Sequence, residues 1–341
     1  MTEPQYAAAG VDLVSAEAAK EQIGRLVAST RTAFSAGHIG AFGGMVRIPG
    51  GMRNPTLVMS TDGVGTKVLV AMQAGRFDTV GEDLVNHSVN DILVHGARPL
   101  AFLDYIAGHR LPVAMILGVV EGVARACRAH DMALAGGETA QMPGLYAEQT
   151  FDLAGTIIGV VEADEALHGD RICPGDVLVA YEASGLHTNG YTLARRVLFD
   201  VMHCTLESPV RGSVASLADA LLAVHRSYAV AIRPALPRLH GLAHITGGGI
   251  AGNLVRVLPD GCQAIIEPAS WQWPALCTMI AEGGQVSRDE MRDVFNLGVG
   301  MIAVVPSAAV DAVRAFATTA GVGSWVCGAV RSGAREVRFA D

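Results

Sequence analysis

The sequence has little charge, few aromatic residues and no long apolar run. Charged residues make up 17 % of the 341 residues and aromatic residues 5 %, whereas hydrophobic residues make up 50 %. This balance favours extensive burial and is compatible with a subunit interface in addition to a core. Apolar stretches such as 113–120 are well short of the roughly 20 residues that span a bilayer, so we expect no membrane partner. Trp271 and Trp273 are expected in a core or an interface rather than against a nucleotide base.

A basic surplus and a disulfide framework are also missing. The formal net charge is −8, which argues against general binding of nucleic acid, because a phosphate backbone is bound by a basic surface. The six cysteines show neither Cys-x-x-Cys spacing nor the density of a secreted disulfide scaffold, so we expect free thiols. The first residues lack a basic region followed by an apolar one, and the expected location is cytoplasmic.

Length and local pattern predict two mixed α/β domains. A chain of 341 residues is longer than the chain that usually folds around a single hydrophobic core. The polar stretch 162–176 ends in Pro174-Gly175-Asp176 and is the best boundary, so the expected domains are 1–165 and 166–341. Strands are expected to alternate with helices in both halves, which gives an α/β (α+β) fold class. The expected strands are 57–60, 101–106, 153–161, 177–181 and 299–305, and the expected helices are 12–32, 81–95, 111–128, 191–200 and 214–231.

A strand end with phosphate-binding chemistry is predicted at Thr61-Asp62-Gly63-Val64-Gly65-Thr66-Lys67, which follows the apolar run 57–59. The segment offers a carboxylate, two hydroxyls, an ammonium and two permissive glycines. Magnesium prefers carboxylate and phosphate oxygens together, while backbone N–H groups and a lysine neutralise the remaining charge. A plain Asp-Gly turn is the alternative. The spacing is not that of the Gly-x-x-x-x-Gly-Lys-Ser/Thr phosphate loop.

Four polar residues fall on one face of the expected helix 81–95, namely Asp83, His87, Asn90 and Asp91. The rest of the helix surface is largely apolar, which indicates that the helix is buried. Buried carboxylates are expensive unless they are paired or bound to metal. A solvated acidic stripe on an ordinary amphipathic helix is the alternative.

Three further segments are rich in glycine. Gly136–Gly144 follows the apolar stretch 132–135 and adds the carboxylate of Glu138. The loops 184–191 and 246–249 each precede a helical pattern, where free N–H groups and the helix dipole create an anion site. One of these loops could hold a substrate phosphate. Helix capping by Ser, Thr or Asn is the alternative for either loop.

In series, these segments resemble the phosphoribosylformylglycinamidine cyclo-ligase family, whose members are also called aminoimidazole ribonucleotide synthetases. The resemblance implies two related α/β layers and a homodimer whose N-terminal sheets join in a shared barrel. It also implies an ATP-dependent ligase of purine biosynthesis that forms a C–N bond. That reaction cyclises formylglycinamidine ribonucleotide to aminoimidazole ribonucleotide with release of ADP and phosphate. The matching segments span nearly the whole chain in order: 61–67, 83–85 with 89–91, 102–105, 136–144, 184–191, 244–249, 271–274 and 295–301.

The resemblance and the chemical type of each residue imply roles at the site. ATP and Mg²⁺ are the implied cofactors, and a small nucleotide is the implied substrate. Asp62, Lys67 and His187 are the expected catalytic residues. Lys67 would neutralise phosphate charge and His187 would relay a proton, although a satisfied structural histidine is the alternative for His187. The other expected residues are the metal ligands Asp62, Asp91 and Glu138, the nucleotide-binding Gly63, Gly65, Thr66, Lys67, Asn90, Gly137, Glu138 and Thr139, and the substrate-phosphate candidates Asn189, Gly190, Thr246, Gly247, Gly248 and Gly249.

The sequence departs from the family pattern at three positions. His87 stands where an apolar residue is expected, so we interpret it as a structural histidine. Leu186 and Thr188 replace the commoner Pro and Ser of their loop, and Thr188 keeps the hydroxyl. Only His87 therefore loses support as a site residue.

The alternatives to the ligase are two other enzymes of the same broad group and one protein without catalytic activity. A selenophosphate synthetase would need a reactive cysteine or selenocysteine near the N-terminus, but the first cysteine is Cys127. A hydrogenase-maturation carbamoyl dehydratase would need a C-terminal cysteine, but the sequence ends in Arg338-Phe339-Ala340-Asp341. A catalytically silent nucleotide-binding regulatory subunit of the same fold belongs to a different class. The intact Asp62, Lys67, Asp91 and Glu138 argue against it.

Overall fold

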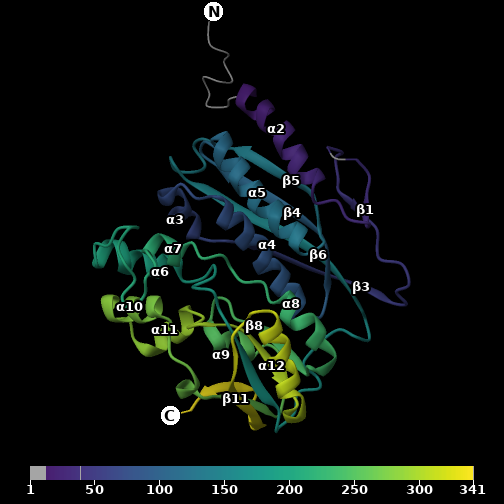
Figure 1. Cartoon of the computed structure of the whole chain (residues 1–341), viewed down its shortest axis with the longest axis vertical. Coiled ribbons are helices and arrows are strands. Elements are labelled where there is room, and N and C mark those ends of the chain that lie inside the picture. The colour runs from purple at the N-terminus through teal and green to yellow at the C-terminus, as the bar shows by residue number, and fades with distance from the viewer. Residues whose placement is uncertain (1–12, 39, 341) are drawn as a thin grey trace, which may run out of the picture. The chain divides into compact units, whose positions relative to one another are not determined.

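The computed structural model describes residues 13–38 and 40–340, and the chain divides into two compact units (Figure 1). The N-terminal unit comprises the residues up to Val89 together with Arg98–Glu162, and the C-terminal unit comprises Asn90–Ala97 together with the residues from Ala163 onward. The helix α4 (Asp78–Leu93) contributes residues to both units. Each unit combines helices with a β-sheet, which confirms the predicted mixed α/β class.

The N-terminal unit is built on a four-stranded sheet with the order β3-β6-β4-β5. β3 (Pro55–Gly63) and β4 (Arg98–Gly108) pair antiparallel with β6 (Phe151–Glu162), whereas β5 (Ala133–Gln141) pairs parallel with β4. A parallel pair needs a crossover connection, which α5 (Val113–Ala129) supplies. The unit also contains α2 (Leu13–Ala28), β1 (Ser35–Ala36), β2 (Met45–Val46) and α3 (Lys67–Ala74).

Glycines allow α4 and α5, which lie side by side in Figure 1, to approach backbone to backbone. A β-carbon added at Gly81 on α4 would lie under 3.0 Å from the Val119 carbonyl oxygen on α5. A β-carbon at Gly122 on α5 would collide in the same way with the Asp78 carbonyl oxygen on α4. This close packing fixes the position of α4, which carries several of the polar residues of the expected site.

Substitution of Gly122 by Ala should therefore destabilise the protein by about 1–3 kcal/mol, because the helices must separate to admit the methyl group. Urea unfolding followed by circular dichroism measures the loss. Gly24→Ala in α2 is the matched control, since a β-carbon at Gly24 meets nothing within 4 Å. That control should gain up to about 1 kcal/mol from helix propensity alone. Equal effects of the two substitutions would contradict the close-packing explanation.

The C-terminal unit is built on a six-stranded sheet with the order β12-β9-β11-β7-β10-β8. All neighbouring strands are antiparallel except β12 and β9, which are parallel. The strands are β7 (Val177–Glu182), β8 (Gly241–His244), β9 (Cys262–Ile266), β10 (Val299–Val305), β11 (Ser324–Ser332) and β12 (Glu336–Phe339). The helical segments are α6 (Tyr191–Arg195), the π-helical η1 (Arg196–Val201), α7 (Leu217–Leu221), α8 (Ala229–Ile232), η2 (Arg233–Arg238), α9 (Gly249–Leu254), η3 (Pro268–Ser270), α10 (Ala275–Gly284), α11 (Arg288–Val294), η4 (Ser307–Ala309) and α12 (Val310–Thr319).

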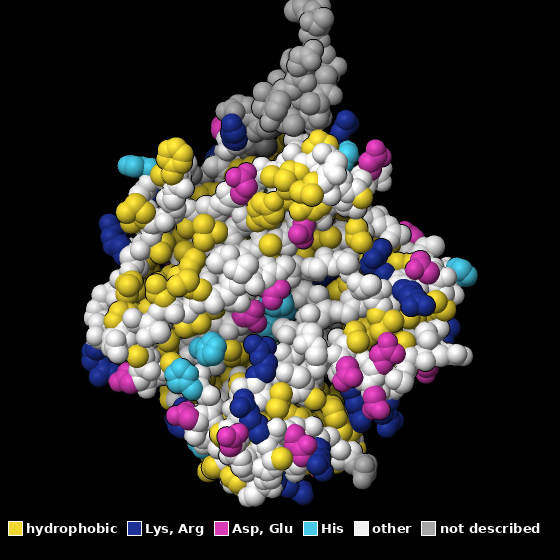
Figure 2. All heavy atoms as spheres, turned by 180° about the vertical axis from the view of Figure 1, so that it is seen from behind, with side chains coloured by type: hydrophobic (Ala, Val, Ile, Leu, Met, Phe, Trp, Pro, Cys, Tyr) yellow, Lys and Arg dark blue, Asp and Glu magenta, His cyan; other side chains and the backbone are white. Residues whose placement is uncertain are grey.

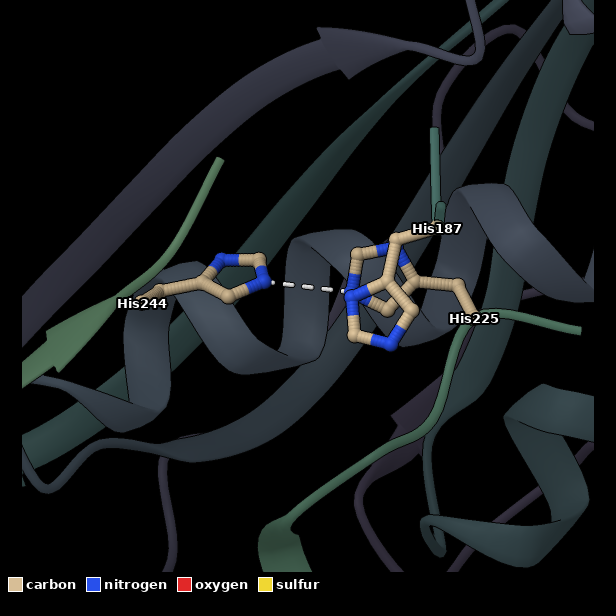
Figure 3. A group of neighbouring side chains, drawn as sticks. All are labelled: His187, His225 and His244. Atoms are coloured by element: carbon tan, nitrogen blue, oxygen red, sulfur yellow. Dashed lines mark hydrogen bonds between the residues drawn. The ribbon is translucent and has the colours of Figure 1, made fainter. Parts of the chain in front are cut away.

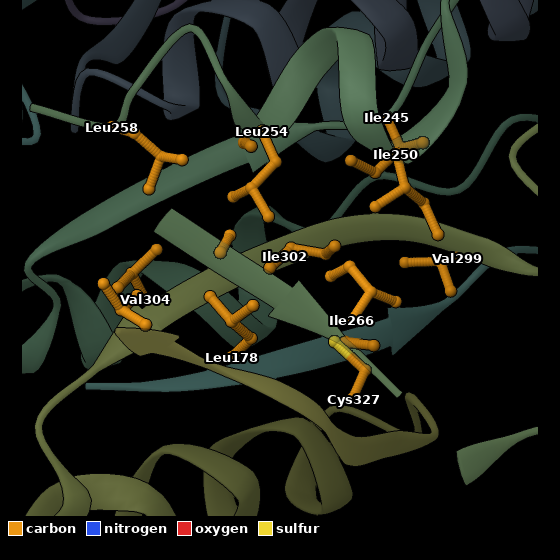
Figure 4. Packing of buried hydrophobic residues seen from close by; sticks show 14 of the residues in the cluster. Leu178, Ile245, Ile250, Leu254, Leu258, Ile266, Val299, Ile302, Val304 and Cys327 are labelled. Atoms are coloured by element: carbon orange, nitrogen blue, oxygen red, sulfur yellow. The ribbon is translucent and has the colours of Figure 1, made fainter. Parts of the chain in front are cut away.

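The core of this unit packs α9 against the sheet (Figure 4). Leu178 on β7 and Ile302 on β10 belong to the same buried cluster as Ile250 and Leu254 on α9. Burial of apolar surface is the main favourable term in folding, so this cluster anchors α9. The glycine-rich loop 246–249 runs directly into that helix and is thereby held in place.

The predicted strands are all present, each within a longer or equal strand. The single helix predicted over 214–231 is wrong, because only α7 and α8 are helical in that segment. The chain between them makes tertiary hydrogen bonds instead. The Ser184 hydroxyl donates to the Val224 carbonyl, and the Asn90 amide donates to the Arg226 carbonyl. These long-range bonds outweigh the local helical pattern.

The cysteines and the helices bear on two further points. All six cysteines are free thiols, as predicted, and four of them are buried. Burial raises the pKa of Cys277 and Cys327 to about 12, which makes these thiols unreactive at neutral pH. None of the helices in residues 13–38 and 40–340 has the length and apolar character needed to cross a bilayer.

Candidate functional site

Asp62 lies at the end of β3, where the sequence predicts phosphate chemistry. Its Oδ1 accepts a hydrogen bond of 2.7 Å from the Gly63 N–H, and its Oδ2 lies 2.9 Å from His87 Nε2 on α4. The Asp62 side chain remains 43 % exposed, whereas that of His87 is 4 % exposed. The carboxylate is thus held in one orientation and still reaches solvent, which suits a metal ligand.

His87, interpreted from the sequence as a structural histidine, lies beside an expected metal ligand. It is buried and contacts the carboxylate of Asp62, so it positions an expected metal ligand. A histidine that hydrogen-bonds a ligating carboxylate is the kind of supporting partner that metal sites use. The sequence signal for this contact is the helical spacing of His87 from Asp83 and Asp91.

Lys67 is fully buried at the start of α3. Its Nζ lies 2.7 Å from Asp83 Oδ2 on α4, and neither side chain is exposed. Burial lowers the pKa of Lys67, and the neighbouring Asp83 carboxylate partly offsets that effect. In this arrangement the ammonium ties α3 to α4. Its expected contact with a phosphate stays a prediction.

A row of paired residues runs across the sheet at the level of Asp62. Asp62 pairs with Gly155, Gly155 pairs with Asp104, and Asp104 pairs with Gly137. A β-carbon at Gly137 would collide with the Asp104 carboxylate, so the glycine leaves room for it. Asp104 was not among the predicted site residues. A carboxylate inside the apolar strand 101–106 was the available signal, because such a group is expensive to bury without a purpose.

A cavity of about 400 Å³ in the N-terminal unit brings several predicted residues together. Gly137, Glu138 and Thr139 on β5 line it, and Asp104 on β4 does so as well. Its other wall includes Lys20 and further residues of α2. A volume of this size is within the range of small-molecule sites. Asp62, Gly63, Gly65, Thr66 and Lys67 are not among the residues that line this cavity.

Asp62 and Glu138 lie on the two edge strands of the sheet, β3 and β5. Three strand spacings separate the edges, which is about 14 Å at about 4.8 Å each. One Mg²⁺ ion brings its ligand oxygens within about 4–5 Å of one another. Within a single chain, these two carboxylates therefore cannot both ligate one ion directly, and phosphate oxygens or water must complete the coordination.

Asp104 should make the stability depend on pH. Burial raises its pKa from 3.8 to about 7. The folded state therefore holds this proton more tightly than the unfolded state, and the associated stability is present below pH ~4 and is lost as the pH rises through ~7. The difference amounts to at most about 4 kcal/mol. Urea unfolding from pH 5 to pH 8 should show a falling free energy that Asp104→Asn flattens. An unchanged pH slope in Asp104→Asn would contradict this assignment.

Asn90 and Asp91 belong to the C-terminal unit and are held by its side chains. The Asn90 amide oxygen accepts from the Tyr228 N–H at 3.0 Å, and its amide nitrogen donates to the Arg226 carbonyl at 2.8 Å. Asp91 Oδ1 lies 2.8 Å from His244 Nδ1, and its side chain is 22 % exposed. Asn90 thus fixes the segment 226–228, and Asp91 is oriented by a histidine as Asp62 is.

Three buried histidines form a cluster in the same unit (Figure 3). The His187 and His225 rings stack with centroids 3.9 Å apart, and His225 Nε2 lies 3.1 Å from His244 Nε2. Ligand atoms of all three lie within 4.8 Å of one another. The near-parallel stack at 20° directs the ring-plane lone pairs of His187 and His225 side by side rather than toward one point. The cluster is therefore a poor metal site. His187 is buried in it.

The two predicted phosphate loops meet in the C-terminal unit. A β-carbon at Gly247 would lie 3.3 Å from the Asn189 amide oxygen. The buried Asn189 amide nitrogen has no hydrogen-bond partner within the described residues. The Asn253 amide holds the carbonyls of Thr246, Gly247 and Gly249 at 2.8–3.3 Å. The carbonyls are thus turned toward Asn253, and a donor of Asn189 is available beside the loop.

Glycine is required at both loop ends that precede a helix. Gly190 has φ 78° and Gly248 has φ 90°, a region that other residues rarely adopt. A β-carbon at Gly249 would collide with the Arg292 carbonyl oxygen. The backbone therefore adopts conformations in these loops that side chains would prevent, as in many anion-binding loops.

Comparison with known proteins identifies the family. Residues 43–161 match the model of the AIR synthase related protein, N-terminal domain, and residues 173–341 match that of the C-terminal domain. The chain belongs to the AIR synthase family. Within the family, it is 47 % identical over 332 residues to a phosphoribosylformylglycinamidine cyclo-ligase of Sorangium cellulosum (strain So ce56), covering 96 % of this chain and 95 % of that protein. It is 44 % identical over 335 residues to the protein of the same name from Thermosynechococcus vestitus, covering 97 % and 98 %.

Solved structures place this AIR synthase family member in a wider fold group. Thiamine-monophosphate kinase from Stenotrophomonas maltophilia K279a superposes with a TM-score of 0.70 at 19 % identity, covering 92 % of this chain and 94 % of that one. The hydrogenase maturation protein HypE in complex with ATP gives a TM-score of 0.65 at 19 % identity, covering 92 % and 88 %. At such low identity the likeness concerns the fold alone.

Proposed function

We propose that the protein is an ATP-dependent ligase that cyclises formylglycinamidine ribonucleotide to aminoimidazole ribonucleotide in purine biosynthesis, releasing ADP and phosphate. The observation that carries the proposal is the 44–47 % identity, over nearly the whole length, to two relatives named phosphoribosylformylglycinamidine cyclo-ligase. No feature of the described residues favours the silent regulatory subunit.

The reaction needs activation of an amide oxygen, which is a poor leaving group. ATP transfers a phosphoryl group to the formyl oxygen, and a neighbouring nitrogen then attacks the carbon to form the new C–N bond. The oxygen leaves with the phosphoryl group as inorganic phosphate. Phosphoryl transfer depends mainly on positioning and electrostatic stabilisation. The protein therefore has to neutralise the charge of the phosphates and orient the reacting groups.

The N-terminal unit offers oxygen ligands and donors that fit magnesium and a polyphosphate. Magnesium is usually bound by one or two carboxylates together with substrate phosphates, and it supplies charge neutralisation when bound. The half-exposed Asp62 carboxylate would ligate such an ion directly, whereas the cavity-lining Glu138 would act through water or phosphate. Asp91, in the C-terminal unit, stays a candidate from the sequence. The backbone of Gly65, Thr66, Gly137 and Thr139 would donate to phosphate oxygens, whereas the Gly63 N–H already donates to Asp62.

The C-terminal unit offers an anion site for the substrate phosphate. The Asn189 amide donor lies beside the loop 246–249, whose carbonyls are held by Asn253. Within the described residues, the N–H groups of Gly247 and Gly248 donate to no protein acceptor. Three donors at adjacent positions suit the oxygens of a ribose phosphate. His187 is buried among His225 and His244, so it would relay a proton only after these side chains move apart.

An isotope experiment tests the reaction. Purified protein with magnesium, ATP and formylglycinamidine ribonucleotide should yield aminoimidazole ribonucleotide, ADP and phosphate in equal amounts. Oxygen-18 in the formyl group should appear in inorganic phosphate, because the activated oxygen leaves with the phosphoryl group. Label in water would point to direct dehydration. Tight ATP binding without any ADP formation would favour the regulatory-subunit alternative.

We also infer a homodimer formed through the open face of the N-terminal sheet. Leu57 and Met59 alternate on the edge strand β3 and are 43 % and 63 % exposed. They face away from α4, since Asp62 on the alternate positions contacts that helix. Figure 2 shows hydrophobic side chains gathered in patches on one side of the molecule. An unprotected apolar edge strand is an aggregation hazard that a partner subunit removes.

Substitution of Met59 by Glu should convert this dimer to a monomer, because a charge would be buried in an apolar interface. Sedimentation equilibrium at micromolar concentration measures the change. Val230→Glu replaces an apolar residue of the C-terminal unit that is 74 % exposed and should leave the dimer intact. A fully active wild-type monomer would exclude the shared-sheet assembly.

A further inference from the structure

The C-terminal unit contains a second cavity, of about 690 Å³, that the proposed reaction does not use. It lies between the segment 267–273, the helix α11 and the end of β12. None of the predicted catalytic, metal-binding or phosphate-binding residues lines it. Its lining instead combines aromatic rings with two guanidinium groups.

Aromatic rings form one wall of this cavity, which we call the tryptophan cavity. Trp271 and Trp273 line it, and both are only partly buried. The Trp271 indole N–H donates to the Leu297 carbonyl at 2.9 Å, and the Trp271 ring packs 6.2 Å from that of Trp325. These contacts fix the orientation of the Trp271 ring beside the cavity. Trp271 also packs against the core of the unit, in line with the core or interface position expected from the sequence.

Arginines provide the positive charge of the cavity. Arg288 and Arg292 are four residues apart on α11 and therefore lie on the same face. The Arg292 guanidinium stacks on Phe339, 4.1 Å from the ring centroid. Its ion pair with Asp289 is long at 3.5 Å, and the Asp289 side chain is 89 % exposed, so the pair contributes little. Two like charges at this spacing are unfavourable by themselves, and a bound anion would relieve their repulsion.

We propose that the tryptophan cavity binds a purine nucleoside monophosphate. The base would stack on the indoles, since base–aromatic stacking is favourable and tolerant of the base. The phosphate would bind Arg288 and Arg292, because guanidinium groups match phosphate oxygens in charge and geometry. Glu267 lines the same cavity and can accept an N–H from the base edge. The volume suits a ligand of this size.

The proposal separates this ligand from both partners of the proposed reaction. Formylglycinamidine ribonucleotide carries a phosphate but no aromatic ring, so it would leave the indole wall unused. ATP carries more negative charge than two arginines match, and the cavity lining has one carboxylate, Glu267, to share a magnesium ion. The site therefore does not depend on the proposed function, and its test can fail while the ligase assignment holds.

Intrinsic fluorescence gives a direct test. The chain has three tryptophans, and two of them line the cavity while the third, Trp325, packs against Trp271. Titration of the whole protein with adenosine or guanosine 5′-monophosphate, without magnesium, should quench this fluorescence in a saturable way. The nucleoside should bind at least about tenfold more weakly for lack of the phosphate contacts. Ribose 5-phosphate, which lacks the base, should cause no quench.

Substitutions in the cavity make the assignment specific. Arg288→Gln and Arg292→Gln should each weaken monophosphate binding by about tenfold or more while binding of the nucleoside is unchanged. Arg211→Gln, an exposed arginine of the same unit, should bind as the wild type does. Binding to Trp273→Leu is measured by equilibrium dialysis with labelled nucleotide, because this substitution itself alters the fluorescence. Thermal unfolding verifies that each variant is folded, and the exposed Arg288 gives a variant that keeps the packing of Arg292 on Phe339.

Three results would overturn the proposal. The first is the absence of quenching by both monophosphates at millimolar concentration. The second is equal quenching in wild type and both arginine variants, which would place the nucleotide elsewhere. The third is displacement of the monophosphate by formylglycinamidine ribonucleotide together with a raised KM for that substrate in Arg288→Gln, which would make this cavity the substrate site.

Discussion

Replacement of Lys67 by Met should lower the free energy of unfolding by about 3–5 kcal/mol, because it leaves the carboxylate of Asp83 buried without its ammonium partner. Both side chains have no exposed surface, and their charged atoms lie 2.7 Å apart. Urea unfolding at pH 7 measures the loss. A surface ion pair is the appropriate control. Removal of Arg98, which pairs with Asp131 with side chains 45 % and 65 % exposed, should cost at most about 1 kcal/mol.

The double variant Lys67→Met/Asp83→Leu separates the structural role of Lys67 from its predicted role at phosphate. Replacing both partners of a buried pair by apolar residues is often neutral, so the fold should recover. We expect ADP formation to remain low, because the predicted phosphate-neutralising cation is still missing. Recovery of both stability and turnover would contradict the catalytic role and leave Lys67 as a residue that ties α3 to α4.

Local pattern was sufficient for the elements that carry the site. The apolar run before Asp62 is a strand, and the expected helix at 81–95 corresponds to α4. Both follow from hydrophobic periodicity, which depends only on neighbours in the sequence. The two glycine-rich loops also precede helices, as their Gly190 and Gly248 indicate.

The contacts between segments that are distant in the sequence could not be predicted from the sequence. The partner of Lys67 depends on how α3 packs on α4, and the neighbour of Asp62 depends on the rotation of α4. Strand order places Asp62 and Glu138 at opposite edges of one sheet, although their motifs look alike in the sequence. Asp104 could be recognised as a candidate site residue only from the pairing register of β3, β6 and β4, which aligns it with Asp62. Such contacts depend on tertiary packing, which cannot be predicted from the composition of the sequence or the spacing of its residues.

Substitution of Asp62 by Asn should reduce magnesium-dependent turnover by about a hundredfold or more while the fold is retained. Asparagine keeps a carbonyl oxygen to accept from the Gly63 N–H and a polar contact for His87, but it removes the negative charge that magnesium prefers. A charge lost at a phosphoryl-transfer site weakens stabilisation of the transition state, and lost interactions of this kind cost about 3 kcal/mol. Steady-state ADP formation during cyclisation, measured against magnesium concentration, gives the effect.

Asp152→Asn on β6 is the matched control for Asp62→Asn. Asp152 Oδ1 accepts from the N–H of the next residue at 2.9 Å, just as Asp62 Oδ1 does at 2.7 Å. Asp152 is an exposed residue of the same sheet, so its substitution should change turnover less than about twofold. His87→Gln should fall between the two, with a raised magnesium requirement, because it loosens the orientation of Asp62 without removing its charge. Near-normal turnover in Asp62→Asn, with circular dichroism unchanged, would remove Asp62 from the metal site and leave His87 with a purely structural role.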